Sequence, residues 1–402
     1  MKVDKILVNG TVVTPFGRFT NAVGIKDGKI AFIAEDVADV EALEVVDLQG
    51  KFLLPGVIDA HIHFQDPGFT HREDFEHGTA ACAAGGITTG MSHPMNVPPI
   101  VDVESYETNV KAYEGRGIVD YAVHGGGTAE NGKLVQDLWL KTGATCVKMF
   151  MCFSGIEFPF VQDDAMFDIL QKLSACGGLA IIHAENQPLI KLMEKRLQEE
   201  GRKDPLAYNE SRPEIVEIEA IRRAIFLIEK ANAEALIVHV STVEGLQEIK
   251  EAQARGVKIW AETCPHFLTF VREDMNELGS YLKFSPVMRG EENRLKMWEL
   301  LDKGYVNTMG SDHCPYEKSE KDASIGDIWK APNGLPGLEV MLPVLLDGVN
   351  KGYTSLERIA QITSYNPSKI YGLYPKKGVI QPGSDADFTV VDMDLVKTYT
   401  DA

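Results

Sequence analysis

The chain has 402 residues, of which 44% are hydrophobic and 25% charged, an ordinary composition for a globular protein. Its 59 acidic and 40 basic side chains give a net charge of −19. Nucleic acids and anionic membranes attract clustered lysine and arginine, so we expect neither as a partner. The length allows a barrel of roughly 250 residues together with a smaller domain.

The cysteines and the first residues indicate the compartment. The six cysteines form no CxxC pair and mostly lie in apolar stretches, which predicts reduced thiols in a protein core. The first ten residues, MKVDKILVNG, lack the apolar segment of a signal peptide. No apolar run is long enough to span a bilayer. We therefore expect a cytoplasmic protein.

The two chain ends are typical of short strands joined by turns. Residues 1–54 contain KILVNGTVVT, AVGIKDGKIAFIA and EVVDLQGKFLLP, and Asp27-Gly28 in the second run is a hairpin signal. Residues 376–402 contain GVIQPGSDADFTVVDMD, which has the same character. We assign both ends to one small β-sandwich, into which residues 55–375 are inserted.

Residues 55–375 alternate between strand-like and helix-like stretches. Segments 214–231 and 243–256 are amphipathic at helical spacing. The candidate strands are 56–64, 86–93, 119–126, 144–151, 178–185, 235–241, 257–263 and 305–312. Eight strands that alternate with helices predict an α/β fold of the TIM-barrel, (β/α)8, type. The polar segment 315–334 follows the last strand, and loops of such length usually border a site.

Six polar side chains lie near the C-terminal ends of five of these apolar runs. In a (β/α)8 barrel all such ends point to one face, which carries the active site. The six are His61 and His63 in GVIDAHIHF, Lys148 in ATCVKMFM, His183 in GLAIIHAEN, His239 in ALIVHVST and Asp312 in YVNTMGSDHC. Their convergence would provide what a hydrolytic site with two metal ions needs.

Each candidate also has a purely structural interpretation. A single strand histidine usually packs in the core, but His61 and His63 are two residues apart and face the same side. Lys148 could pair with an acidic neighbour. Alternatively, burial depresses its pKa, and the neutral amine reacts with CO2 to give a carbamate that can bridge two cations. Asp312 could cap a turn, or it could bind a metal ion and move protons.

The other histidines are weaker candidates. Taken singly, His183 and His239 could be core residues, but their places at the ends of two successive strands favour ligands of one metal ion. We expect the remaining ones to be structural or to lie behind the metal ligands: His71, His77, His93, His124, His266 and His313.

Together these motifs resemble the cyclic amidohydrolases, a branch of the amidohydrolase superfamily with hydantoinases, dihydropyrimidinases, allantoinases and dihydroorotases. The resemblance runs through PGVIDAHIHFQDPG, GGITTGMSHP, VKMF, IIHAEN, VHVST, AETCPHFL, FSPVMR, GSDHCPY and PGSDADFTVVDMD. It implies two divalent metal ions, usually zinc, held by the six residues above, with Lys148 carboxylated as the bridging ligand. It also implies that metal-activated hydroxide attacks a ring carbonyl, with Asp312 as the catalytic base and then acid.

Within this family the chain looks most like the L-hydantoinases and allantoinases, on segments such as YNESRPEIVEIEAIRRA and GLYPKKG. The resemblance implies that Asn333 in APNG and Ser285 in FSPVMR contact the substrate ring. The substituent of the ring is expected to face the loops after the first four strands, around Gln65, Phe69, Asn96, Phe153 and Phe158.

Two departures from the family narrow the substrate. Dihydroorotases carry an arginine for the substrate carboxylate where this chain has Gln65, and a neutral amide cannot form the bidentate pair. Dihydropyrimidinases and D-hydantoinases carry a tyrosine for the oxyanion where this chain has Phe153. Oxyanion stabilisation then falls mainly to metal, with help from Ser154. Both departures favour the L-hydantoinase or allantoinase end of the family.

The predicted function is therefore a hydantoinase-like enzyme that acts on a small cyclic amide or ureide. The alternatives, in order, are allantoinase and then dihydropyrimidinase or dihydroorotase. A non-catalytic scaffold on the same fold is expected least, because such relatives have lost metal ligands. The resemblance also implies a homotetramer. Relatives continue for several dozen residues beyond the DADFTVVDMD strand, so either this protein is short or its last segment is not represented.

Overall fold

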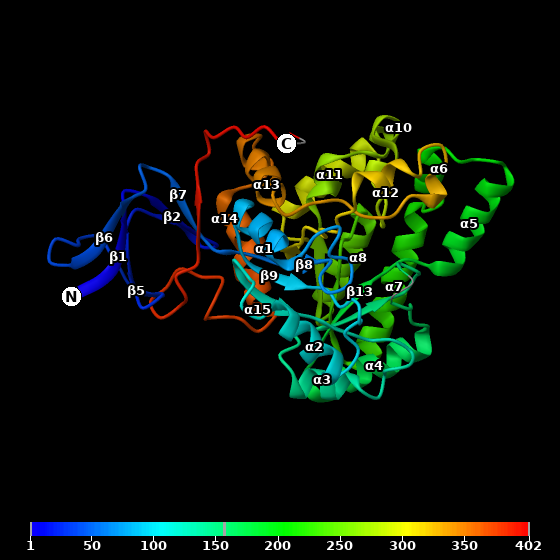
Figure 1. Cartoon of the computed structure of the whole chain (residues 1–402), viewed down its shortest axis with the longest axis horizontal. Helices are drawn as coiled ribbons and strands as arrows, with labels where there is room; N and C mark the ends of the chain where they lie inside the picture. Colours follow the sequence, from blue (N-terminus) through cyan, green and yellow to red (C-terminus); the bar gives the residue numbers. More distant parts are fainter. Residues whose placement is uncertain (1, 156–157, 401–402) are drawn as a thin grey trace.

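The computed structural model describes residues 2–155 and 158–400, which form a barrel of parallel strands and, beside it, two small sheets (Figure 1). The barrel strands are β8 (Val57–Ile62), β9 (Ile87–Ser92), β10 (Asp120–Val123), β11 (Gly125–Gly126), β12 (Val147–Phe150), β13 (Leu179–His183), β14 (Glu234–Ile237), β15 (Ile259–Thr263) and β16 (Thr308–Met309). They pair in parallel in the orders β8-β9-β10 and β11 through β16. A bridge between Ile62 and His313 brings the first strand beside the segment that follows the last.

Burial on both faces explains why these strands are apolar almost throughout. Every residue of β12, VKMF, and of β13, LAIIH, is buried. Parallel strands covered by helices on the outside read as continuous hydrophobic runs rather than as alternating ones. Each of the eight strand segments predicted from the sequence overlaps a strand of the structure. The predicted TIM barrel is therefore confirmed.

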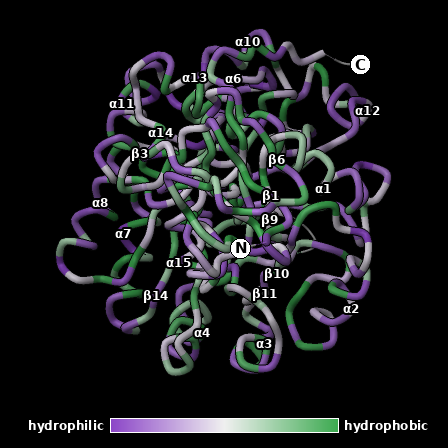
Figure 2. The backbone as a smooth tube through the Cα atoms, turned by 90° about the vertical axis from the view of Figure 1, so that its left-hand side faces the viewer, coloured by the Kyte–Doolittle hydropathy of each residue, from purple (hydrophilic) through white to green (hydrophobic). Residues whose placement is uncertain are grey.

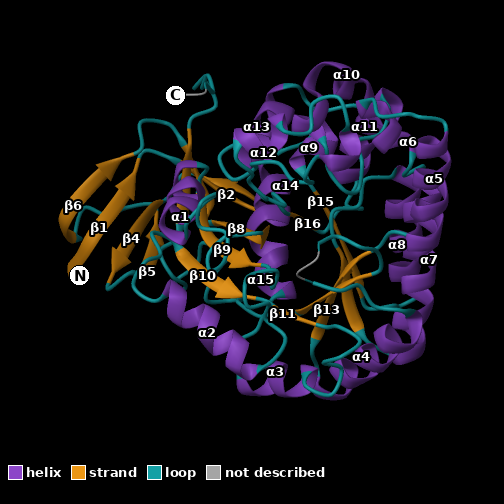
Figure 3. Ribbon diagram, turned by 45° about the vertical axis from the view of Figure 1, so that its right-hand side comes forward, coloured by secondary structure: helices purple, strands orange, loops and turns teal. Residues whose placement is uncertain are grey.

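Helices surround the strands (Figure 3). They are α1 (Phe75–Ala84), α2 (Val103–Tyr113), α3 (Val135–Lys141), α4 (Asp163–Cys176), α5 (Gln187–Glu199), α6 (Pro205–Glu210), α7 (Glu214–Ala231), α8 (Val243–Ala254), α9 (Pro265–Thr269), α10 (Met275–Leu278), α11 (Glu291–Asp302), α12 (Lys318–Asp322), α13 (Met341–Asn350), α14 (Leu356–Ala360) and α15 (Asn366–Ile370). The peripheral helices alternate between hydrophilic and hydrophobic stretches along the tube of Figure 2, as amphipathic helices do.

The ends of α7 and α8 show why the sequence pattern locates them. Acidic Glu214 and Glu217 lie in the first turn of α7, where they complement the helix dipole. Asn232 ends that helix in the left-handed conformation that a C-cap requires. Thr242 caps α8 through a bond from the N–H of Gly245. The helix predicted at 214–231 is confirmed at both ends, and α8 covers most of the predicted 243–256.

The chain ends form the two small sheets, whose strands are β1 (Lys2–Val8), β2 (Thr11–Thr14), β3 (Gly17–Phe19), β4 (Ala22–Lys26), β5 (Lys29–Ala34), β6 (Glu41–Asp47), β7 (Phe52–Pro55) and β17 (Phe388–Val391). One sheet has the order β5-β4-β1-β6 and the other β17-β7-β2-β3. Because β17 pairs with β7, both chain ends contribute, as Figure 1 shows in red and blue. The domain boundaries 1–54, 55–375 and 376–402 stay a prediction.

The turn between β4 and β5 is the predicted hairpin. Asp27 and Gly28 both have positive φ, 52° and 71°, as a two-residue turn of this kind requires. Buried Leu7, Val23 and Leu53 belong to one apolar cluster that spans both sheets. Among the helices of the described residues, none has the length and apolar character needed to cross a bilayer.

Candidate active site

The six predicted metal-binding residues come together at the C-terminal ends of the barrel strands. His61 lies within β8, Lys148 within β12, and His183 ends β13. All six line one cavity of about 560 Å³: His61, His63, Lys148, His183, His239 and Asp312. The predicted substrate contacts line the same cavity: Gln65, Asn96, Phe153, Ser154, Ser285 and Asn333. The predicted convergence is thus present, while the roles of the residues stay predictions.

Asp312 lies beside two of the candidate ligands, His61 and His63. Its Oδ1 is 3.1 Å from Nε2 of His61 and 3.2 Å from Nε2 of His63. Atoms of His61, His239 and Asp312 that could bind a metal ion all lie within 4.8 Å of one another. Burial opposes ionisation of Asp312, but the adjacent His61 holds the pKa of the carboxyl well below its usual range. Asp312 is therefore a carboxylate, the form that binds a cation.

Buried carboxylates orient two of the histidine rings from behind. Nδ1 of His61 lies 2.5 Å from Oε1 of Glu262, and Nε2 of His183 lies 2.8 Å from Oε2 of Glu185. A ring that donates one N–H to a carboxylate can offer its other nitrogen to a metal ion, which at His61 would displace the proton that a pKa of about 9 retains. That second nitrogen is the one left to bind a metal ion.

Lys148 is fully buried, and its Nζ has no hydrogen-bond partner among the described residues. Burial lowers the pKa of the amine to about 8, despite the nearby Asp312. The Nζ lies over the ring of Phe150, 4.7 Å from the ring centroid. An unpaired buried ammonium is costly. The alternative interpretation, a pair between Lys148 and an acidic neighbour, finds no such pair among the described residues, and the lowered pKa increases the share of the reactive neutral amine.

Two of the candidate ligands have an unusual backbone. His239 and Asp312 have φ of 39° and 48°, in the left-handed region. The other non-glycine residues there among those described are Asn9, Asp27, Gln49 and Asn232. Residues other than glycine enter this region rarely, Asn, Asp and His more often than the rest, and holding them there costs free energy. Such strain persists where surrounding structure imposes it, and it is concentrated at functional sites.

Gln65 lines the cavity, but its amide is already paired inside the protein. Its Nε2 donates to the carbonyl of His63 at 2.9 Å, and its Oε1 accepts from Arg72 at 3.4 Å. Arg72 lines the cavity as well, and the sequence analysis missed it. Its guanidinium pairs with Glu320 at 2.6 Å, so the positive charge is neutralised within the protein.

Asn96 is also tied into the protein through its amide nitrogen. Nδ2 donates to Tyr113 at 2.7 Å and to Asn109 at 2.8 Å. These bonds orient the side chain of a residue that lines the cavity.

Other polar atoms on the cavity wall lack partners. Oγ of Ser154 and Oδ1 of Asn333 are buried without a hydrogen-bond partner in the described part of the chain. Ser285 donates its hydroxyl to Glu185 at 2.9 Å. Buried unpaired polar atoms that face a cavity are what a polar ligand would satisfy.

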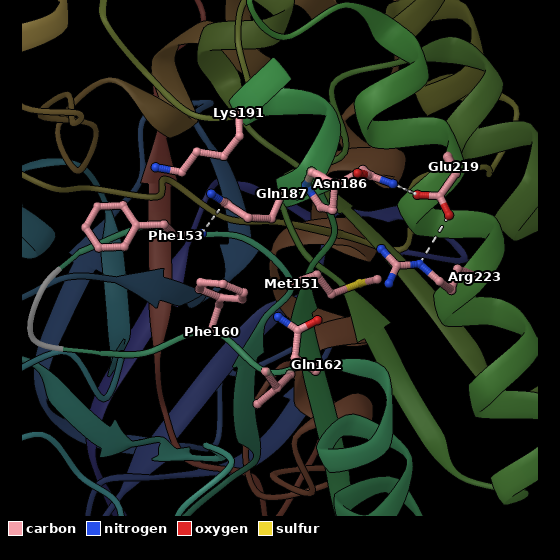
Figure 4. Close-up of a pocket in the computed structure, with 11 residues that line it drawn as sticks. Met151, Phe153, Phe160, Gln162, Asn186, Gln187, Lys191, Glu219 and Arg223 are labelled. Atoms are coloured by element: carbon pink, nitrogen blue, oxygen red, sulfur yellow. Dashed lines mark hydrogen bonds and ion pairs between the residues drawn. The ribbon is translucent and has the colours of Figure 1, made fainter. Parts of the chain in front are cut away.

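Phe153 borders a second cavity of about 580 Å³, shown in Figure 4. Its side chain is half-exposed, and its backbone N–H donates to Oε1 of Gln187 at 2.7 Å. Arg223 lies across this second cavity and pairs with Glu219 at 3.2 Å. Phe158, which was expected to face the substituent, is fully buried and packs near Phe150 instead, so that expectation is wrong.

A model of the amidohydrolase family matches residues 52–401. The chain belongs to the amidohydrolase family. The match covers the whole barrel and therefore every candidate ligand described above. The family predicted from the motifs is confirmed.

Relatives within the amidohydrolase family fall in the predicted branch. An L-hydantoinase of Paenarthrobacter aurescens is 38% identical over 396 residues, 98% of this chain and 86% of the relative. An allantoinase of Deinococcus radiodurans is 34% identical over 394 residues, 97% and 87% of the two chains. The solved structure of L-hydantoinase (dihydropyrimidinase) from Arthrobacter aurescens has a TM-score of 0.94 at 37% identity and covers 96% of this chain and 86% of that one.

Sequence analysis missed the carboxylates behind the histidines of this amidohydrolase. Glu185 could have been found, because it lies two residues after His183 and ends a strand-like run with it. Glu262 is one acidic residue in the apolar run of β15, where a buried charge signals a partner. The partner of either residue could not be read from the sequence.

His93 has the supporting place expected of it. Its ring stacks on His61 with 3.9 Å between centroids and 2° between planes. The lone pairs of a ring lie in its plane, so two parallel stacked rings cannot both point at one ion. In this arrangement His93 supports the ring of His61, even though its own nitrogens lie near His61 and His63.

The contact between Glu262 and His61 leads to a prediction about metal affinity. Glu262→Gln should weaken zinc binding by about 10- to 100-fold, because the ring loses the carboxylate that orients it. Competition with a chromogenic chelator measures the affinity. Glu234→Gln is the matched control, since Glu234 lies at the start of β14 and accepts from Trp260 at 2.9 Å. Equal zinc affinities in the two variants would contradict the assignment.

Proposed function

We propose that this amidohydrolase opens the ring of a cyclic ureide in a metal-dependent reaction, with hydantoin-type substrates before allantoin. The observation that carries the proposal is a single cavity lined by four histidines, an unpaired buried lysine, a carboxylate and unpaired polar wall atoms. Family membership and the hydantoinase and allantoinase relatives support an enzyme that hydrolyses cyclic amides.

The donor set fits two divalent ions. We assign His61, His63 and Asp312 to one ion and His183 and His239 to the other. Imidazole and carboxylate donors suit zinc, and Nδ1 of His239 is buried without a partner among the described residues. Bound at this place, the ions would supply a water of lowered pKa and polarise a ring carbonyl.

Lys148 completes the set if it is carboxylated. The carbamate would convert an unpaired buried amine into an anionic group with two oxygens, one for each ion. Its burial favours this chemistry twice, because it lowers the pKa of the amine and leaves no other partner nearby in the described residues.

Asp312 is the residue we assign to proton transfer. Its Oδ1 faces the imidazoles of His61 and His63, and its lowered pKa keeps it ionised, the form whose oxygen lone pairs can accept a proton. The carboxylate would take the proton of the attacking water and deliver it to the leaving ring nitrogen, as base and then acid.

The cavity wall supports a neutral ring as the substrate. Asn333 and Ser154 offer unpaired oxygen atoms, and Ser285 lies between the cavity and Glu185. A neutral ring needs such donors and acceptors rather than a charge clamp. A carboxylate substituent would find Gln65 and Arg72 already paired inside the protein.

Allantoin is the second candidate. Allantoinases of Deinococcus radiodurans and Escherichia coli are 34% and 35% identical to this chain. The ureido substituent of allantoin is polar, and Asn96 and Arg72 add polar groups to the wall of the cavity. Dihydropyrimidines and dihydroorotate follow in that order.

We also propose a cytoplasmic homotetramer, on the family resemblance and the prevalence of symmetric oligomers among enzymes. Light scattering that gave the mass of a single chain would refute the tetramer.

Carboxylation of Lys148 predicts a carbon signal in the NMR spectrum. Wild-type protein loaded with zinc in isotope-labelled bicarbonate should show one slowly exchanging carbamate carbon. Lys148→Gln, whose side chain is polar but one atom shorter and has no reactive amine, should lack that signal and lose zinc. A wild-type protein that binds two zinc ions without the signal would contradict the proposal.

The role of Asp312 predicts a loss of turnover beyond any loss of metal. Asp312→Asn should lower kcat by about 10²- to 10⁴-fold in preparations that still contain both ions, because the amide cannot accept the proton. Metal content is measured by atomic absorption on the same samples. Asp347→Asn is the control, since Asp347 on α13 is exposed and pairs with Lys351, which follows that helix. Near-normal kcat in a metal-loaded Asp312→Asn protein would refute the role.

A substrate panel tests the proposed function itself. The zinc-loaded enzyme is given hydantoin, 5-substituted hydantoins, allantoin, dihydrouracil and dihydroorotate, and kcat/KM is measured for each. We expect the highest value with a 5-substituted hydantoin and the lowest with dihydroorotate, since burying an unpaired carboxylate costs several kcal/mol. A maximum at dihydroorotate would overturn the interpretation of Gln65.

A further inference from the structure

Two lysines near the cavity are buried without a carboxylate partner among the described residues. Lys283 and Lys321 are each 4% exposed. Neither lines the cavity, and neither forms an ion pair in the described part of the chain. A buried ammonium needs hydrogen-bond acceptors, and both lysines find them on the backbone of one segment, 328–334.

Lys283 holds the first half of this segment. Its Nζ donates to the carbonyls of Ile328 at 2.9 Å, Trp329 at 3.4 Å and Ala331 at 2.6 Å. The ammonium also lies over the ring of Tyr208, 4.5 Å from its centroid. Three carbonyl acceptors and a ring face satisfy the group without a counter-ion.

Lys321, on α12, holds the second half. Its Nζ donates to the carbonyls of Pro332 and Gly334, each at 2.9 Å, and to Ser280 at 3.2 Å. Pro332 and Gly334 are the two neighbours of Asn333. The carbonyls of the residues before and after Asn333 are thus anchored to the same ammonium.

Asn333 itself is left free of the two lysines. Neither ammonium bonds its carbonyl, as far as the described residues show. Asn333 lines the cavity, and its side-chain Oδ1 is buried and lacks a partner in the same part of the chain. The segment is thereby anchored on both sides of the residue that presents polar atoms to the cavity.

The backbone at Gly334 shows how little room the anchored segment has. Gly334 has φ of 153°, and a Cβ there would lie 2.4 Å from the carbonyl oxygen of Cys314. Its N–H donates to the carbonyl of Lys283 at 3.2 Å. Lys283 therefore anchors the segment through its backbone as well as its side chain.

We propose that Lys283 and Lys321 are positioning residues that hold segment 328–334 so that Asn333 meets the substrate ring. The inference rests on the proposed function, because it assumes that Asn333 contacts the substrate. Bonds from an ammonium are stronger than those from a neutral donor, and each ammonium bonds several carbonyls at once. Loss of Lys321 frees the carbonyls of Pro332 and Gly334, the residues before and after Asn333. Loss of Lys283 frees carbonyls of residues 328–331, which precede it. In either case Asn333 shifts relative to the metal-binding residues.

The expected kinetic signature is a change in substrate binding. A contact made equally in the ground and transition states affects KM and leaves kcat unchanged. Lys321→Met should therefore raise KM by about tenfold or more with kcat within about twofold of wild type. Lys283→Met should act in the same direction. Zinc content should stay at the wild-type level, because neither lysine touches a candidate ligand.

Hydrogen–deuterium exchange tests the positioning without reference to turnover. Peptides that cover residues 328–334 should exchange faster in Lys321→Met than in wild type, while the barrel strands stay unchanged. Lys318→Met is the matched control, since Lys318 is on the same helix, is exposed and pairs with Asp322 at 3.2 Å. Lys321→Arg, which keeps the charge and its donors, should recover part of both effects.

Each combination of results gives a separate conclusion. Faster exchange with raised KM supports the inference, and unchanged exchange in both methionine variants overturns it. Faster exchange with unchanged KM refutes the link to Asn333. A zinc-loaded wild type that turns over no cyclic ureide refutes the proposed function, while exchange still decides whether the lysines anchor the segment. If Lys321→Met does not fold, Lys321→Gln is measured in its place and interpreted by the same outcomes.

Discussion

Burial of ionisable side chains at the mouth of the barrel is the constraint on which the rest of the structure depends. A centre made of histidine, lysine and aspartate has to be shielded from water, and each such group costs free energy when it is buried without a partner. Buried counter-groups reduce that cost: Glu262 contacts His61, and Arg212 pairs with Glu185, which holds His183. Lys148 lacks such a partner among the described residues, and the proposed carboxylation would give it one.

Segment 328–334, which follows the last barrel strand, meets the same constraint, but here the buried charges are positive. Apart from the short 3-10 turn Ile328–Lys330, its backbone is irregular and partly buried, so most of its carbonyls need donors that no helix or sheet provides. Lys283 and Lys321 supply those donors from two other parts of the chain. At the strand ends, carboxylates contact the rings of His61 and His183. In segment 328–334, the ammonium groups of Lys283 and Lys321 bond backbone carbonyls. In both cases a buried charge fixes a part of the chain that borders the cavity.

Recognition at the cavity wall depends on which polar atoms the protein has already paired. Gln65 and Arg72 face the cavity, yet their polar groups bond to His63 and Glu320. They contribute shape and orientation rather than charge. A ligand can form hydrogen bonds with unpaired atoms such as Oγ of Ser154. A site with unpaired polar groups discriminates against ligands that leave those groups without a partner. This division favours a neutral, hydrogen-bonding ring over an anion.

Local features of the sequence were enough for the barrel, the hairpin at Asp27-Gly28 and the ligand candidates, because strand burial, turn chemistry and position at a strand end are properties of neighbouring residues. The burial of Phe158, the pairing of Arg72 with Glu320 and the partner of Glu262 were not accessible in this way. Many acidic residues could lie behind His61, and only the packing of strands far apart in the sequence brings one within 2.5 Å of its ring. The sequence by itself determined which residues could do the chemistry. The tertiary structure decided which atoms face the cavity, because ring orientation and pairing depend on contacts between distant segments.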